Sequence, residues 1–176
     1  AALDLGADIV NDVRSLARPA ALATVASHPT CGVCLMHMHG EPEDMQSAPY
    51  DGVDIVTEVA RWLGQRCATV QGAGIAKQRI VLDPGIGFGK TPAHNWALLR
   101  RQSELGVLDQ PILVGWSRKS SLGQLTGRAV HDRLAASVAA ALAGVQRGAR
   151  IVRVHDVAAT VDALKVWQAA GLVCKA

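Results

Sequence analysis

The 176-residue sequence lacks several features that would assign a protein to a functional class at once. No apolar run approaches the roughly 18 residues of a membrane-spanning helix, so no membrane partner is expected. Four cysteines are too few and too scattered for a disulfide framework, which indicates a reducing compartment, the cytoplasm. The net charge is only +3, and no basic stripe with interleaved aromatic residues is present, so nucleic-acid binding is not expected.

Glycine, by contrast, is plentiful, and the stretch LDPGIGFGKT at 82–91 looks at first like a phosphate-binding loop. That motif needs a glycine five residues before the glycine of Gly-Lys-Thr, and Pro84 occupies the position. The dinucleotide fingerprint fails as well, because Lys90 stands where its third glycine belongs. The stretch is therefore an aspartate, Asp83, at the end of an apolar run, followed by a tight loop.

Five short apolar, β-branched runs predict buried parallel strands, and helical periodicities lie between them. This alternation predicts an α/β fold with a parallel sheet. Length alone favours a doubly wound sheet, since a (β/α)₈ barrel needs about 250 residues. The corresponding alternative is a complete, flavodoxin-like domain that binds a phosphorylated ligand without catalysis. The predicted strands are 9–13, 33–36, 80–82, 112–115 and 151–154, and the predicted apolar helix faces are Val53/Val56/Ala60/Leu63/Cys67/Val70, Leu134/Val138/Leu142/Val145 and Val157/Val161/Leu164.

Polar side chains lie at the carboxyl end of every predicted strand. Because the carboxyl ends of parallel strands meet at one edge, one shared site is more economical than five unrelated polar residues. The carboxylate and amide groups suit a flat heterocycle such as an aminopyrimidine, and the cations, with amides at the start of a helix, suit an anion. In chain order, these residues are Asn11 and Asp12; His37; Asp83; Ser117, Arg118 and Lys119; and Arg153 and His155.

The same segments resemble the dihydropteroate synthase family of folate biosynthesis. The resemblance rests on Asn11-Asp12, CLMHMHG at 34–40, LDPGIGFGK at 82–90, GWSRKS at 115–120 and RVHD at 153–156, in order along the whole chain. It implies a (β/α)₈ TIM barrel of the pterin-binding family. It also implies a transferase that joins p-aminobenzoate to a dihydropterin pyrophosphate with release of pyrophosphate.

Against that family, residues 1–176 resemble the C-terminal part of one barrel domain, strands four to eight, with βα units one to three absent. The opening AALDLGA, which looks like a helix tail closed by Gly6, fits this expectation. An incomplete barrel would have unpaired edges, so we expect little or no activity from this chain alone.

The resemblance also implies roles for individual residues. It implies a homodimer formed through the last helices, and Mg²⁺ as cofactor, with the family's metal-contacting residue in the absent part and therefore no metal ligand here. Lys90 and Thr91 are interpreted as loop residues, Trp116 as a packing residue, and Cys31 and Cys34 as structural thiols. The implied sites are Asn11, Met36, Asp83, Gly115 and Lys119 for the pterin, Phe88 and Ser117 for p-aminobenzoate, Arg153 and His155 for pyrophosphate, and Lys119, Arg153 and His155 for catalysis.

Overall fold

The computed structural model describes residues 2–40 and 54–172, which contain a five-stranded parallel sheet. Its strands follow one another in space in the order of the sequence, β1-β2-β3-β4-β5. A doubly wound sheet requires the strand order to reverse at a switch point, so the flavodoxin-like alternative is wrong. Sequential order is that of a barrel wall. The strands are β1 (Ile9–Asp12), β2 (Gly32–Met36), β3 (Ile80–Asp83), β4 (Ile112–Val114) and β5 (Ala149–Val152).

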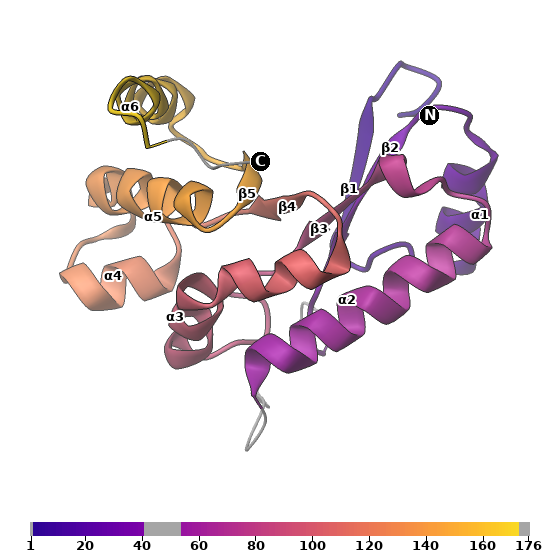
Figure 1. Ribbon diagram of the computed structural model, residues 1–176, viewed down its shortest axis with the longest axis horizontal. Coiled ribbons are helices and arrows are strands. Elements are labelled where there is room, and N and C mark those ends of the chain that lie inside the picture. The colour runs from indigo at the N-terminus through magenta and orange to yellow at the C-terminus, as the bar shows by residue number, and fades with distance from the viewer. Residues whose placement is uncertain (1, 41–53, 173–176) are drawn as a thin grey trace.

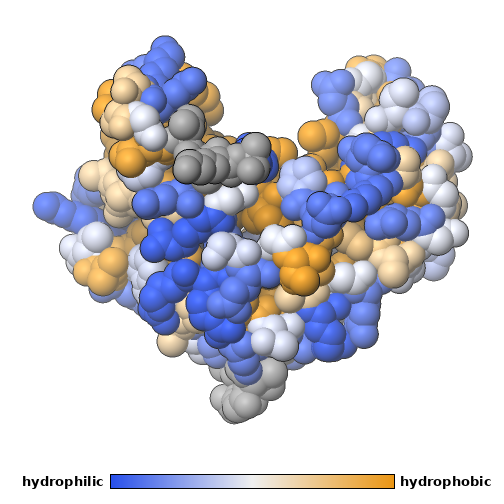
Figure 2. Space-filling model, viewed as in Figure 1, coloured by the Kyte–Doolittle hydropathy of each residue, from blue (hydrophilic) through white to orange (hydrophobic). Residues whose placement is uncertain are grey.

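The helices line the outer side of this curved sheet, from α1 past α2 and α3 to α5 and α6 (Figure 1). The opposite side of the sheet is open, and Figure 2 shows the molecule hollowed between α6 and the lobe that holds the start of the chain and α1. The helices are α1 (Pro19–Ser27), α2 (Ile55–Gly72), α3 (Pro92–Arg100), α4 (Ser120–Thr126), α5 (Leu134–Gln146) and α6 (Val157–Ala169), with short 3₁₀ helices η1 (Lys77–Arg79), η2 (Gln102–Leu108) and η3 (Val130–Asp132).

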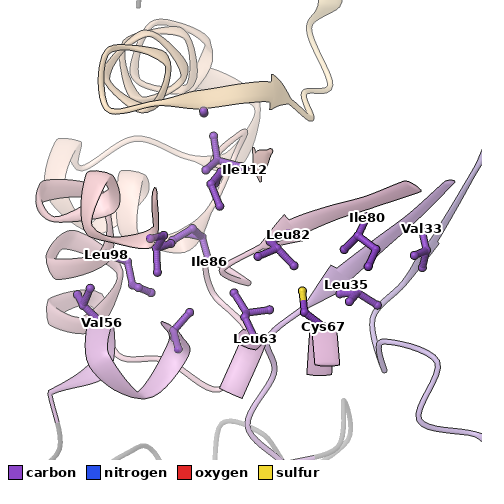
Figure 3. Packing of buried hydrophobic residues seen from close by; sticks show 14 of the residues in the cluster. Val33, Leu35, Val56, Leu63, Cys67, Ile80, Leu82, Ile86, Leu98 and Ile112 are labelled. Carbon is purple, nitrogen blue, oxygen red and sulfur yellow. The ribbon is translucent and has the colours of Figure 1, made fainter. Parts of the chain in front are cut away.

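Alternation along the strands separates a helix-facing core from an inner face. Leu35, Leu82 and Ile112 are buried in the core, together with Leu63 from α2 and Leu98 from α3 (Figure 3). The intervening strand residues face the other way, into the hollow. The sheet thus directs alternate side chains at the carboxyl ends of its strands toward one common region.

Helix α2 confirms the first predicted helical face. Its buried residues include Val56, Leu63, Cys67 and Val70, while Val53 of the predicted set lies outside the described residues. The Asp54 carboxylate accepts a hydrogen bond from the N–H of Thr57 and so caps the first turn.

The helices predicted from the second and third apolar faces are confirmed as α5 and α6, but neither of these apolar faces is buried. Helix α5 turns its small residues to the sheet, and a Cβ on Gly144 would lie only 3.0 Å from Val114 Cγ2, so larger side chains do not fit there. Its Leu134 is 44% exposed. Helix α6 packs on α5 and leaves Val157 and Val161 60% and 41% exposed.

Two further features concern the ends of elements. Residues 2–6 form turns instead of the expected helix tail, although Gly6 has the positive φ of +85° typical of a helix end. Within residues 2–40 and 54–172, no helix is long and apolar enough to cross a bilayer.

Candidate active site at the carboxyl ends of the strands

Three of the predicted site residues are joined by one guanidinium. Arg153, just after β5, donates from Nη2 to Asp83 Oδ2 at 2.8 Å and from Nη1 to Asn11 Oδ1 at 3.0 Å. These residues lie 142 and 70 positions apart in the chain, at the ends of β1, β3 and β5. The predicted convergence of the strand ends is therefore present in the structure.

Asp83 is held in place by the loop that follows it. The residue is fully buried, and its Oδ1 accepts a hydrogen bond of 2.7 Å from the N–H of Gly85. Gly85 has φ of +68°, and a Cβ there would lie 1.8 Å from the carbonyl oxygen of His37. Only glycine allows the loop to pass this close to the end of β2, so Asp83 and Gly85 form one unit.

Lys119 reaches the same region from the turn after β4. Its ammonium lies 4.3 Å from the centre of the Phe88 ring, a cation–π contact. A Cβ on Gly87 would stand 3.2 Å from Lys119 Cδ, so the glycine loop leaves space for the lysine stem. Burial lowers the pKa of Lys119, and the neighbouring Asp83 carboxylate opposes that shift.

The two remaining pterin-set residues also lie on the inner face. Met36 pairs with Asp83 across β2 and β3 and is buried. A Cβ on Gly115 would approach Arg153 Nη2 to 2.8 Å, so this glycine provides the space through which the guanidinium passes.

Ser117 and His155 form a separate pair. The buried Ser117 Oγ accepts a hydrogen bond from the backbone N–H of His155 at 3.2 Å and lies 2.9 Å from His155 Nδ1. The hydroxyl therefore orients the imidazole. Its predicted contact with p-aminobenzoate stays a prediction.

Arg118 does not join the other cations, contrary to its grouping with Lys119 as an anion-binding residue. It adopts a left-handed backbone conformation, with φ of +59°, and its guanidinium pairs with Asp156 at 2.7 Å. Its N–H donates to Ser137 Oγ, and its carbonyl accepts from Arg133 Nη1. These contacts to α5 and to the turn after β5 hold the turn so that Lys119 faces the site.

Two buried polar residues anchor the glycine loop, a role that was predicted for neither of them from the sequence. Lys90 Nζ donates to the carbonyl oxygens of His37, Gly85 and Phe88, at 3.2, 2.9 and 3.1 Å. Burial lowers the pKa of Lys90 to about 7, although Asp83 opposes the shift. The interpretation of Lys90 as a loop residue is correct in position, but the sequence did not reveal that it fastens the loop to β2.

Asn95, on α3, is the second anchor. Its Oδ1 accepts from the N–H of Gly87 at 2.9 Å, and its Nδ2 donates to Ser121 Oγ at 3.0 Å. It shares its buried helix face with Leu98 and Leu99, and a polar residue on an apolar face was an available signal. Thr91 caps the same helix by accepting from the N–H of His94.

The described residues offer no ready metal centre. No group of three or more His, Cys, Asp or Glu side chains among them could hold a metal ion. Asp83 and Asn11, the oxygen donors nearest the site, are engaged by Arg153. The residues described here therefore do not fit a Mg²⁺ site, and no chemical step is assigned to that ion.

Cys31 and Cys34 are structural thiols and Trp116 is a packing residue, as expected. Cys31 and Cys34 are buried and free, and desolvation raises the pKa of Cys34 to about 12. His37 is fully buried, and the same effect lowers its pKa to about 2. Trp116 is buried and stacks on Trp96 with ring centres 5.0 Å apart, so it packs behind β4.

Comparison with known proteins agrees with this geometry. The family model for pterin binding enzymes matches residues 1–155. The dihydropteroate synthase of Neisseria meningitidis serogroup B is 54% identical over 172 residues, covering 95% of this chain and 60% of the relative. The chain thus spans about 60% of the length of that relative.

Two solved structures are similar throughout the chain. Dihydropteroate synthase from Stenotrophomonas maltophilia, with imidazole bound in its active site, has a TM-score of 0.93 and 51% identity and covers 99% of this chain and 65% of that one. The enzyme from Xanthomonas albilineans in complex with 7,8-dihydropteroate has a TM-score of 0.89 and 48% identity, with 98% and 64% covered. A sheet in sequential order, a shared site at its strand ends and a family match over most of its length place this chain in the pterin binding enzyme family.

Proposed function

We propose that the protein acts as a dihydropteroate synthase, condensing p-aminobenzoate with a dihydropterin pyrophosphate. The observation that carries this proposal is that buried Asp83 lies together with half-buried Lys119 and the exposed Asn11 and Arg153 at the carboxyl ends of the strands. The pterin ring presents paired N–H donors on one edge, which Asp83 is suited to accept. The similar Xanthomonas albilineans enzyme was solved with 7,8-dihydropteroate, which joins both substrates in one molecule.

In this proposal the binding residues divide between the substrates. Asp83 and Asn11 hold the donor edge of the pterin, Lys119 donates to a ring acceptor, and Met36 and Gly115 line the ring. Phe88 borders the p-aminobenzoate, and Ser117 lies near its carboxylate. Arg153 and His155 bind the pyrophosphate.

The chemistry is departure of a leaving group under electrostatic control. The aniline nitrogen forms a bond to the exocyclic carbon of the pterin, the carbon–oxygen bond to pyrophosphate breaks, and the amine loses a proton. Pyrophosphate keeps the electron pair of the broken bond, so Arg153 and His155 stabilise negative charge as it grows. The Asp83 carboxylate favours positive charge on the ring, which assists the departure.

A homodimer and a cytoplasmic location belong to the same proposal. The exposed apolar residues Leu134, Val157 and Val161 on α5 and α6 support association through these helices, because a monomer exposes such side chains to water at a cost. Sedimentation of the chain with and without Val161→Asp tests the dimer, which the substitution should dissociate. A monomeric wild-type chain would contradict it.

The function itself is tested by binding of the dihydropterin pyrophosphate, measured by titration calorimetry, because little or no turnover is expected from this chain alone. Asp83→Asn should weaken binding by about tenfold or more, because a charge-assisted acceptor is lost. Asp162→Asn is the matched control, since Asp162 is exposed on α6. Equal binding by all three proteins, or no binding by any, would overturn the proposal.

A further inference from the structure

The Arg153 guanidinium occupies the acceptors that the proposed function gives to the pterin. Its two terminal nitrogens donate to Asp83 Oδ2 and Asn11 Oδ1. A guanidinium is a planar carbon carrying N–H donors in a fork, and the 2-amino-pyrimidinone edge of a pterin has the same N–C–N donor pattern. One residue of the chain therefore presents to this site the chemical group that the ligand would present.

We propose that Arg153 is a specificity-determining residue that makes the site discriminate pyrophosphate-bearing pterins from unphosphorylated ones. The inference rests on the proposed function. A pterin ring that binds Asp83 and Asn11 displaces the guanidinium from both. The displaced side chain regains charge-assisted hydrogen bonds only when the ligand brings an anion.

The surroundings of Arg153 allow this exchange. The Asp83 carboxylate is 1% exposed, whereas the Arg153 side chain is 41% exposed, so the arginine is the partner that can leave. Gly115 has no side chain to obstruct the guanidinium, since a Cβ there would collide with it. The Lys119 ammonium also interacts with Asp83, so the carboxylate keeps a cation nearby when Arg153 moves away.

The balance of interactions predicts opposite effects of one substitution on two ligands. An unphosphorylated pterin must break the Arg153–Asp83 pair without compensation, so removing the guanidinium should strengthen its binding. For a half-exposed pair the gain is about three- to fivefold. The pyrophosphate ester should lose about tenfold or more, because its partner is gone.

The experiment compares the wild-type chain, Arg153→Met and the matched control Arg150→Met by titration calorimetry. Arg150 is an exposed arginine on β5, the strand that Arg153 follows. The probes are 6-hydroxymethylpterin, its dihydropterin pyrophosphate ester and inorganic pyrophosphate. We expect Arg153→Met to bind 6-hydroxymethylpterin more tightly and the two anions more weakly, with Arg150→Met unchanged.

Each other outcome has a distinct meaning. Weaker or equal binding of 6-hydroxymethylpterin by Arg153→Met would overturn this inference and leave the proposed function standing, provided that the ester still binds the wild-type chain. If the wild-type chain binds none of the probes, both this inference and the proposed function are wrong. Should Arg153→Met fail to fold by circular dichroism, Arg153→Lys replaces it. A lysine lacks the paired N–H donors of a guanidinium, so Arg153→Lys should still lower the ratio of the affinity for the ester to the affinity for 6-hydroxymethylpterin. An unchanged ratio would overturn the inference.

Discussion

The ammonium of Lys119 lies over the ring of Phe88, 4.3 Å from its centre, and links the turn after β4 to the glycine loop after β3. Lys119→Met should weaken pterin binding by about tenfold or more, because a charged donor to the ring is lost. Titration calorimetry measures the change, with Lys165→Met, at an exposed position of α6, as control. Unchanged affinity in Lys119→Met would remove Lys119 from the site.

Phe88→Leu tests the other member of the pair. A partly exposed cation–π contact contributes about 0.5–1 kcal/mol, so pterin affinity should fall only about two- to fivefold while Lys119 loses its fixed position. A larger loss than in Lys119→Met would mean that the ring contacts the ligand more strongly than the lysine does.

Asn95→Leu should destabilise the fold by about 1–3 kcal/mol, because the hydrogen bonds from the half-buried N–H of Gly87 and to the buried Ser121 hydroxyl are both lost. Urea denaturation followed by tryptophan fluorescence measures the change. Gln124→Leu is the control, since Gln124 lies exposed on α4 and, like Asn95, lines a small cavity of about 280 Å³. Equal stability of the two variants would show that the Asn95 anchor contributes nothing.

Lys90 should make stability depend on pH. Its pKa is about 7 in the fold, against 10.5 for an unperturbed lysine. Between these values the unfolded chain binds more protons, so the free energy of unfolding rises with pH in this window, and below about pH 7 the contribution of Lys90 no longer changes with pH. Lys90→Met removes that rise and, at every pH, leaves three buried carbonyls without their donor.

Urea denaturation at pH 7 and pH 9.5 checks this expectation. The stability difference between wild type and Lys90→Met should widen with pH, whereas Lys165→Met should track the wild type. A difference that stays constant would show that the Lys90 ammonium keeps its charge throughout this range.

Gly85→Ala should be far more damaging than Gly74→Ala. Both glycines have positive φ, which costs any other residue about 1–2 kcal/mol, but Gly74 has open space around it. At Gly85 a Cβ would overlap the His37 carbonyl, so the loop has to move. Thermal unfolding compares the two, and similar melting temperatures would contradict the close approach.

The strands and their polar ends could be predicted because a buried parallel strand needs an unbroken apolar run. All five predicted runs are strands, but burial was wrongly predicted for the two edge strands: Ile9 of β1 is 49% exposed, and β5 buries only Ala149. Strand β5 also starts and ends two residues earlier than predicted, so Arg153 lies beyond it. The spatial order of the strands could not be predicted in this way, because periodicity carries no information on which strand neighbours which. Length favoured the doubly wound sheet, and only the resemblance pointed to the barrel arrangement.

The long-range polar contacts that hold the loops and turns in place could not be predicted. Lys90 binds carbonyls up to 53 residues away, and nothing in local spacing marks a lysine as buried. The left-handed Arg118 is likewise set by Ser137 and Arg133. On α5 the large apolar residues dominate the pattern, yet close approach of the backbone to β4 selects its small face instead.

The fastening of the glycine loop at both sides limits how this protein can change over evolutionary time. Lys90 and Asn95 fix the loop through backbone groups, so insertions or deletions between Asp83 and Lys90 would disconnect those links at once. We therefore expect natural variants with altered ligand preference to arise by side-chain replacement within this segment, or by length changes in other loops.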